Sequence, residues 1–397
     1  MRAAVPNYLQ AHIGQAAPGH RFGLYYAGWN DDLSATKTGK TEVLKALCTL
    51  PEHSQTLHTA LLARQSAQAA ALAPSTVLTL PLLSSSPFAT GLGNEHPLEN
   101  GFSFLSPYGL PYLPGSGVKG VLRRAAEELA SGDWGAAQGW SQSAIDALFG
   151  PGEQVIQADP EAAARQGALI FWDVLPRPAK QSLAVEIMTP HLGDYYQGKK
   201  SPNTSLLPVP IPFLALPAGS GFMFHVQCQL KRLPDASLRE SWRALVETAF
   251  EHAGQWLGFG AKTAVGYGRM GIDPQEIKRR QQAQQQALEA QQKAEKAARE
   301  QALPPAQKLL SQLADRLALL PKDPRNGQAL LQKTDRPQWK ETLDWLTSAA
   351  PTMAACSASE REALAAEVKK RLQAHYKVEG NAEKAMKSTL ATLRTGP

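Results

Sequence analysis

Two segments of the chain combine small residues with cations in a pattern that suits a phosphate group. The first begins with Gly115, Ser116 and Gly117, and Lys119 and Arg123 follow within two helical turns. If a helix begins here, its first backbone N–H groups are unpaired and its dipole favours a negative charge. Lys119 and Arg123 are four residues apart and would share one helical face. The alternative is a helix capped by Ser116 that carries two solvated basic residues.

The second segment, residues 258–269, is rich in glycine. Glycine allows positive φ values and a close approach of backbone to a ligand, and four are present here: Gly258, Gly260, Gly266 and Gly268. Charge, hydrogen bonds and a surface for base stacking are offered by Lys262, Thr263, Tyr267 and Arg269. A plain Gly-rich β-turn would explain the same residues, so this segment alone is a weak indication.

Groups that could catalyse a reaction are few. Glu95, His96 and Glu99 lie in residues 84–114, and His191 lies further along the chain. A carboxylate could bind a metal, and a histidine or carboxylate could act as a general base. The three cysteines are far apart, and the nine histidines show no metal-ligand spacing, so we expect neither a metal site nor a cofactor.

The positive charge of the chain is concentrated in its last third. Residues 1–274 carry 20 Lys/Arg and 21 Asp/Glu (net −1), whereas residues 275–397 carry 21 and 14 (net +7). Any nucleic acid bound by the first part would therefore meet a local groove rather than a general positive field. No apolar run is long enough for a membrane span, and the cysteine pattern fits a reducing compartment, so we expect a cytoplasmic protein without membrane contact.

Periodicity predicts a mixed helical and strand domain over residues 1–274. A helix over 54–73 precedes a strand at 76–83, the helix from 115, strands at 168–175, 182–188 and 221–230, a helix over 237–257 and a last strand at 267–272. Reduced to its skeleton, this is the βαββαβ order of a ferredoxin-like, RRM-like fold of the α+β class. Residues 189–219 predict an inserted loop or hairpin with Lys199 and Lys200 at its tip, although these lysines also fit a solvated turn.

The composition changes after Pro274. Residues 275–303 predict a polar helical stalk that links two domains, and Pro304 and Pro305 end it. Residues 304–397 contain four amphipathic segments that predict a small all-α C-terminal domain, over 308–320, 337–349, 359–375 and 382–394.

Several local motifs occur in a recognisable order. Residues 91–101 read GLGNEHPLENG, residues 108–116 read YGLPYLPGS, residues 186–196 read EIMTPHLGDYY and residues 208–214 read PVPIPFL. Together with the helix start at 115 and the Gly-rich segment, they resemble the RAMP superfamily, and within it the family of the sixth subunit of Cmr (type III-B) CRISPR effector complexes. The resemblance covers roughly residues 18–274 and leaves the tail without a family.

The resemblance implies a RAMP palm that binds the crRNA backbone towards its 3′ end, helps hold the guide–target RNA duplex in antiviral defence, and does not cut. It implies RNA contacts at Ser116, Lys119, Arg123, His191, Lys199, Lys200, Lys262, Thr263, Tyr267 and Arg269. The backbone would approach RNA at Gly115, Gly117, Gly258, Gly260, Gly266 and Gly268. The implied partners are crRNA, target RNA, other Cmr-type RAMP subunits and the small helical subunit of the complex.

Two other functions stay open at this point. A RAMP endoribonuclease acting on crRNA precursor or target RNA would need a base such as Glu95, His96 or His191. The resemblance implies that the slicing subunit of such complexes uses an aspartate between the first strand and first helix, and residues 84–114 contain none. A mainly structural function is the third hypothesis, in which the basic tail docks another subunit or an RNA end.

Overall fold

The computed structural model describes residues 3–36, 38–135, 139–152, 157, 165–189, 198, 201, 210–318, 329–330, 336–377 and 380–395. These residues form two compact units, Met1–Lys278 and Arg279–Pro397. The first contains helices and an antiparallel sheet, as expected for the α+β class. None of the described helices is long and apolar enough to cross a membrane.

A four-stranded antiparallel sheet forms the centre of the first unit. Its order is β4 (Leu169–Phe171), β7 (Gly221–Cys228), β1 (Val77–Ser84) and β8 (Met270–Ile272). β1 and β7 pair along nearly their whole length, from Val77↔Gln227 to Leu83↔Gly221. β8 pairs only with residues 82–84 of β1, so it is a short edge strand. The four strands confirm four of the five predicted segments, and the fifth, at 182–188, lies elsewhere.

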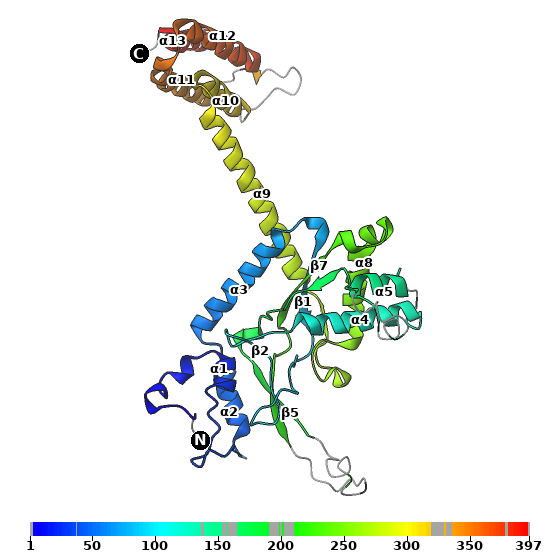
Figure 1. The fold of residues 1–397 in the computed structure, drawn as a ribbon. Helices are drawn as coiled ribbons and strands as arrows, with labels where there is room; N and C mark the ends of the chain where they lie inside the picture. Colours follow the sequence, from blue (N-terminus) through cyan, green and yellow to red (C-terminus); the bar gives the residue numbers. More distant parts are fainter. Residues whose placement is uncertain are drawn as a thin grey trace. The chain divides into compact units, whose positions relative to one another are not determined.

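Helices cover one face of this sheet (Figure 1). They are α4 (Gly115–Ser131), α5 (Gln142–Phe149) and α8 (Ala236–His252). α4 buries Val118, Leu122 and Leu129, whose spacing puts them on one side of a helix, and they pack into the same core as the sheet. α8 continues as one turn of π-helix, η7 (Ala253–Leu257), before the chain enters the Gly-rich segment. The predicted helices at 115 and 237 are thus confirmed.

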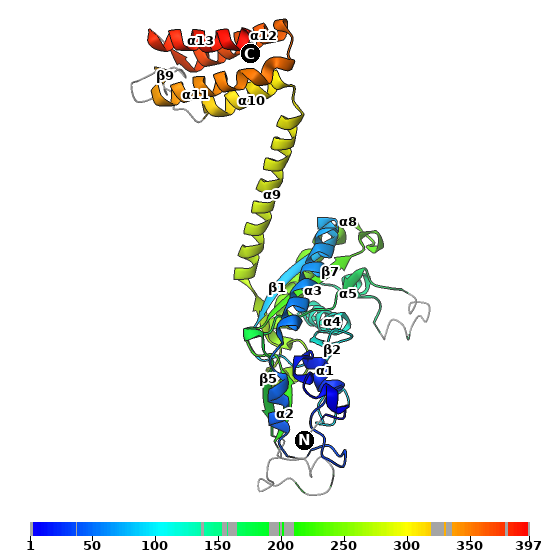
Figure 2. The ribbon, with the colours of Figure 1, turned by 90° about the vertical axis from the view of Figure 1, so that its left-hand side faces the viewer.

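The segment at 182–188 is confirmed as a strand, but it belongs to a second sheet. β5 (Ala184–Met188) pairs only with β6 (Ile211–Ala215), and this hairpin extends away from the central sheet (Figures 1 and 2). α2 (Lys40–Leu47) packs against both strands. The insertion that the sequence predicts as a loop or hairpin therefore has a hairpin at its base, and its middle lies outside the described residues.

The rest of the first unit surrounds these elements. Its helices are α1 (Pro18–Gly23) and α3 (Glu52–Ala70), and its smallest sheet joins β2 (Phe104–Leu105) to β3 (Leu110–Pro111). Single 3₁₀ turns lie at Asn7–Leu9, Ile13–Gln15, Pro74–Thr76, Ala179–Gln181, Leu230–Arg232 and Thr263–Val265.

The second unit is almost entirely helical. α9 (Pro274–Ala302) leads into it, and α10 (Pro305–Ala318), α11 (Arg336–Ala349), α12 (Ala358–His375) and α13 (Asn381–Thr395) pack together. A 3₁₀ segment (Ala350–Ala355) and a two-residue parallel pair, β9 (Ala329–Leu330) with β10 (Tyr376–Lys377), complete it. Leu313, Leu346, Val368 and Leu393 are buried in its core. The polar helix and the four amphipathic segments predicted beyond residue 274 are all helical.

His58 makes the stability of the first unit depend on pH. It lies in α3, is only 7% exposed, and its Nε2 has no hydrogen-bond partner among the described residues. Burial, together with the positive charge of Arg177, lowers the pKa of His58 to about 4 from its usual 6.5. The unfolded chain therefore binds this proton more readily than the folded chain, so stability falls as the pH drops below 6.5.

We expect the unit to lose about 2 kcal/mol of unfolding free energy between pH 7.5 and 5.0 through this group alone. Urea unfolding at the two pH values, in parent and His58→Gln chains, measures it. The variant should lack this part of the pH dependence. Equal slopes in both chains would show that His58 is protonated without cost in the folded state.

Candidate functional site

The N-terminus of α4 is already occupied by a carboxylate of the chain itself. The helix begins at Gly115, and the Gly115 N–H donates to Asp173 Oδ1 at 2.7 Å. Pro114 occupies the N-cap position, and the exposed Ser116 side chain makes no hydrogen bond to any described residue. The prediction that Ser116 caps this helix is therefore wrong, because Ser116 lies inside the first turn. A phosphate at this helix end would compete with Asp173.

Further along α4, Lys119 and Arg123 line a polar cavity of about 440 Å³. The cavity lies beside the C-terminal end of α5 and the edge strand β4. Two more cations and two amides from other parts of the chain line it: Arg165, Arg232, Gln166 and Gln229. We call Lys119, Arg123, Arg165 and Arg232 the cationic cavity.

The cations of this cavity differ in how they are held. Arg123 donates from Nε to Glu127 Oε1 at 3.0 Å and from Nη1 to the Gly150 carbonyl at 3.0 Å, and its Nη2 lies 4.0 Å from Asp146 Oδ1. Lys119 is half-buried and makes neither a hydrogen bond nor an ion pair with a described residue. Arg123 is thus fixed as part of the wall and largely neutralised, whereas Lys119 keeps its charge for a ligand.

Arg232 contributes from η6 (Leu230–Arg232), just after β7. It is exposed, and its Nη1 donates to the neutral side chain of Gln166, 3.2 Å from Oε1. Because an amide does not cancel the guanidinium charge, Arg232 can meet an anion together with Lys119. Neither Arg165 nor Arg232 was predicted from the sequence, since only the sheet topology brings them next to α4.

The Gly-rich segment packs on the base of the β5–β6 hairpin. Lys262 lies 5.5 Å from the Phe213 ring centroid and donates from Nζ to Met188 Sδ at 3.1 Å. The Tyr267 hydroxyl donates to Glu186 Oε2 at 3.1 Å, and burial and then this carboxylate raise the pKa of Tyr267. Both side chains are half-buried. Their contacts thus tie the segment to the hairpin, and Tyr267 could stack on a base only with the part of its ring left uncovered.

Most of the predicted glycines are required by the chain's own backbone. A Cβ would lie less than 3.0 Å from a backbone oxygen at four of the six positions: Gly115, Gly258, Gly260 and Gly268. At Gly268 this distance would be 1.8 Å, to the Phe259 carbonyl. Gly266, with φ +95°, has no atom within 4 Å of its Cβ position, and Gly117 meets only a Leu113 methyl at 3.4 Å. Gly117 and Gly266 are therefore the two positions where a ligand could approach the backbone.

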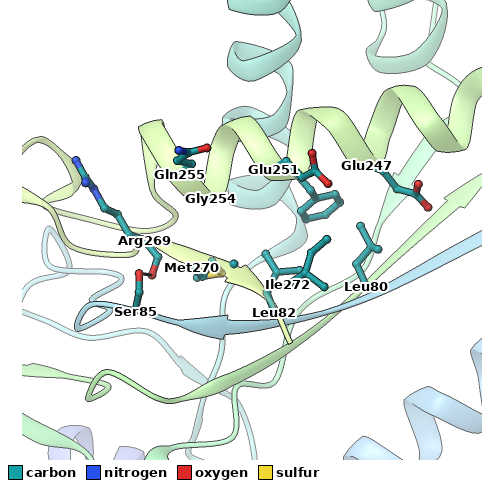
Figure 3. A pocket seen from close by; sticks show the side chains of 12 residues that line it. Leu80, Leu82, Ser85, Glu247, Glu251, Gly254, Gln255, Arg269, Met270 and Ile272 are labelled. Carbon is teal, nitrogen blue, oxygen red and sulfur yellow. Dashed lines mark hydrogen bonds between the residues drawn. The ribbon is translucent and has the colours of Figure 1, made fainter. Parts of the chain in front are cut away.

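The structure places the predicted residues in three environments rather than in one cavity. Lys119 and Arg123 belong to the cationic cavity, and Lys262, Thr263 and Tyr267 are half-buried in the Gly-rich segment beside the hairpin. Arg269 is exposed and lines a cavity of about 590 Å³ under α8 (Figure 3). Neither of these two cavities is lined by both predicted segments. His191, Lys199 and Lys200 lie outside the described residues.

Of the three candidate catalytic groups in residues 84–114, His96 and Glu99 have structural partners. The His96 ring stacks on Phe22, with centroids 3.7 Å apart, and its Nε2 bonds the Phe22 carbonyl at 2.9 Å. Its Nδ1 accepts from the Leu98 N–H at 3.1 Å, so both ring nitrogens are used. Burial lowers the pKa of His96. Glu99 pairs with Lys40 at 2.5 Å, and Glu95 is exposed.

Comparison with known proteins agrees with the motifs. The family model of the RAMP superfamily matches residues 83–271. The CRISPR system Cmr subunit Cmr6 of Pyrococcus furiosus is 30% identical over 226 residues, which are 45% of this chain and 63% of that protein, slightly less than two thirds of its length.

Two solved structures were also matched. One is the cryo-EM structure of the type III-B Cmr-beta complex bound to cognate target RNA (TM-score 0.41, 17% identity, 59% of this chain and 69% of that one). The other is the crystal structure of Cmr6 from Pyrococcus furiosus (TM-score 0.29, 24% identity, 50% and 98%). Residues 83–271 are thus similar to the RAMP superfamily, and the chain is similar in sequence to Cmr6.

Proposed function

We propose that this chain is a non-catalytic subunit of a type III-B CRISPR RNA-guided effector complex. It binds the crRNA backbone, towards the 3′ end of the guide, and helps to hold the guide–target RNA duplex. The 30% identity to a Cmr6 subunit supports the assignment to this kind of complex. Its partners would be crRNA, target RNA, other Cmr-type RAMP subunits and the small helical subunit.

The central sheet and its helices would form the ferredoxin-like palm of this subunit. The order β4-β7-β1-β8 with antiparallel neighbours supports this fold, as does the position of α4 after β1 and of α8 after β7. The β5–β6 hairpin would then be an insertion between the second and third strands of the palm.

The cationic cavity is the observation that carries the proposal. Lys119 and Arg232 present charge without an acidic partner among the described residues, and both belong to a polar cavity with the anchored Arg123. The cations of such a site fit the oxygens of a phosphodiester, which carry the same charge whatever the sequence. It would therefore hold RNA regardless of sequence and leave recognition to base pairing, as guided complexes do.

The Gly-rich segment would supply a second backbone contact. Gly266 leaves open space, and Arg269 is exposed beyond it, so an RNA strand could pass close to both. Lys262, Thr263 and Tyr267 would meet RNA while holding the hairpin base. The endoribonuclease alternative is not favoured, because His96 has no nitrogen free to take a proton.

We expect Lys119→Ala to weaken binding of single-stranded RNA roughly five- to tenfold, to a similar degree for unrelated sequences. Because one phosphate contact is lost, the slope of log affinity against log salt should become shallower by about 0.7. Fluorescence anisotropy over a salt series measures both quantities. Unchanged affinity and slope would show that RNA does not bind at the cationic cavity.

Lys262→Ala in the same assay tests the second segment. If both segments contact one strand, both variants weaken binding, whereas an effect of Lys119→Ala alone would restrict the interface to the cationic cavity. Incubating labelled RNA with the chain in Mg²⁺ and in EDTA tests the endoribonuclease alternative. Cleavage that a His191→Ala change abolishes would establish that alternative.

A further inference from the structure

The positive charge of the helical bundle in the second unit is concentrated on two of its helices. The C-terminal half of α12 and the whole of α13, residues 367–374 and 381–395, contain six Lys or Arg and two Glu (net +4). The other described parts of the bundle, residues 303–318, 337–354 and 356–366, contain four Lys or Arg and five Asp or Glu (net −1). The charge is therefore a property of one helix pair rather than of the bundle as a whole.

α12 and α13 pack side by side and form one layer of the bundle, with α10 and α11 between this layer and α9 (Figures 1 and 2). On α13 the side chains of Met386, Leu390 and Leu393 are buried in the core. Helical spacing places the cations of α13 on the opposite, outward face. The exposed cations of this layer, which we call the basic α12–α13 surface, are Lys369, Lys370, Lys384, Lys387 and Arg394.

The cations of the two helices form one cluster, and its two acids are already paired. Lys387 Nζ donates to Glu383 Oε1 at 2.7 Å. This hydrogen bond lowers the pKa of Glu383, and the charge of Lys369 on α12 acts in the same direction. The other acid, Glu367, accepts from Arg371 Nε at 2.9 Å. The remaining cations form neither a hydrogen bond nor an ion pair with a described residue; they are Lys369, Lys370, Lys384 and Arg394.

The side chains around these cations are small and favour a polyanion over a protein partner. In the described parts of residues 303–395, no large apolar side chain is exposed. Protein interfaces depend on aromatic and apolar anchors and are poor in lysine, whereas phosphodiester strands are bound by Lys and Arg. Small side chains also let a strand come close to the helices; the exposed ones beside the cations are Ala366, Ala385, Ser388 and Ala391.

The basic α12–α13 surface is long enough for several phosphates. Lys384 and Arg394 are ten residues apart on α13, about 15 Å along the helix axis. Lys370 extends the surface across α12. Since no exposed aromatic ring lies among its described residues, the surface offers no platform for base stacking. Binding here would therefore depend on the charge of the backbone and not on its sequence.

We infer that the basic α12–α13 surface binds an RNA strand through its phosphates. This site belongs to the second unit and is separate from the cationic cavity, which belongs to the first. The choice of RNA among polyanions rests on the proposed function, whereas the phosphate chemistry follows from the surface. Two sites on one chain raise its overall affinity for a strand that reaches both.

A double substitution in the full chain, Lys369→Gln with Lys384→Gln, tests the inference by fluorescence anisotropy with single-stranded RNA. Because two phosphate contacts are lost, we expect affinity at 0.05 M salt to fall about tenfold and the slope of log affinity against log salt to become shallower by about 1.4. Lys293→Gln with Lys340→Gln is the matched control, since it removes the same charge from exposed positions of α9 and α11. The control should change affinity less than twofold, and equal losses in both double variants would overturn the inference.

Cross-linking identifies the occupant. With a photoreactive p-benzoylphenylalanine in place of the exposed Ser388, the expected product in the complex reconstituted with guide RNA joins α13 to RNA. A product that contains only protein, or no product, would overturn the inference. Lys119→Ala is measured in the same titrations. If only Lys119→Ala weakens binding, this inference fails and the cationic cavity stands; if only the α12–α13 variant does, the cationic cavity fails and this inference stands.

Discussion

Gly268→Ala is expected to destabilise the first unit by about 3–5 kcal/mol. Gly268 has φ +73°, and an alanine Cβ would lie 1.8 Å from the Phe259 carbonyl oxygen. That carbonyl belongs to backbone that is itself fixed, because the Phe259 N–H donates to the Gly268 carbonyl at 2.9 Å. The Phe259 side chain is fully buried in the core, so the backbone cannot retreat without opening the core.

Gly266→Ala is the matched control for this change. Gly266 also has a positive φ, +95°, but its Cβ position is open. We therefore expect only the conformational cost, about 1–2 kcal/mol. Urea unfolding monitored by tryptophan fluorescence compares the two variants. Equal losses would mean that the clash at Gly268 is relieved by a small local shift.

The glycines illustrate what the sequence can and cannot predict. Their clustering identifies a segment with unusual backbone, and the structure confirms positive φ at Gly258, Gly260, Gly266 and Gly268. The sequence does not reveal why each is needed, because the contacts come from Phe259 and Tyr267 across the folded segment and from the distant Ala89. The largest mutational effect is therefore expected at Gly268, a position that no local pattern distinguishes from Gly266.

Elements with strong local patterns were predictable. β1, β7, α4 and α8 have apolar residues at strand or helix spacing, and their positions agree with the prediction within a few residues. α1, α2 and α5 were missed, since helices of six to eight residues depend on tertiary packing more than on propensity. Strand pairing was also not predictable: periodicity predicts that β5 is a strand, but it does not predict that β6 is its only partner strand.

The candidate site likewise contains residues that the sequence predicted and residues that it did not. Lys119 and Arg123 were found because a four-residue spacing places them on one helical face. Arg165 and Arg232 reach the cavity through the sheet order, which puts β4 beside β7. The cap of α4 comes from Asp173, 58 residues beyond Gly115, so no local rule could have preferred it to Ser116.

Arg232→Glu is expected to have the largest effect on RNA binding, a loss of affinity on the order of 50-fold at physiological salt. The change removes one cation from the cationic cavity and adds an anion near Lys119 and Arg123. Lys231→Glu is its control, because Lys231 is the preceding residue of η6, is also exposed, and does not line the cavity. Both variants change the net charge by the same amount.

The comparison of these two variants distinguishes RNA binding at the cationic cavity from a response to the overall charge of the chain. Charges further from the RNA than about 8 Å are largely screened at 0.15 M salt, so Lys231→Glu should alter the affinity less than threefold there. Anisotropy titrations of the two variants and the parent, at 0.05 and 0.15 M salt, give the result. If the two variants lose equal affinity at both salt concentrations, RNA responds only to the overall charge of the chain. In that case the four cations of the cavity form no binding site, and the basic residues beyond 278 become the stronger candidates for the contact with the guide.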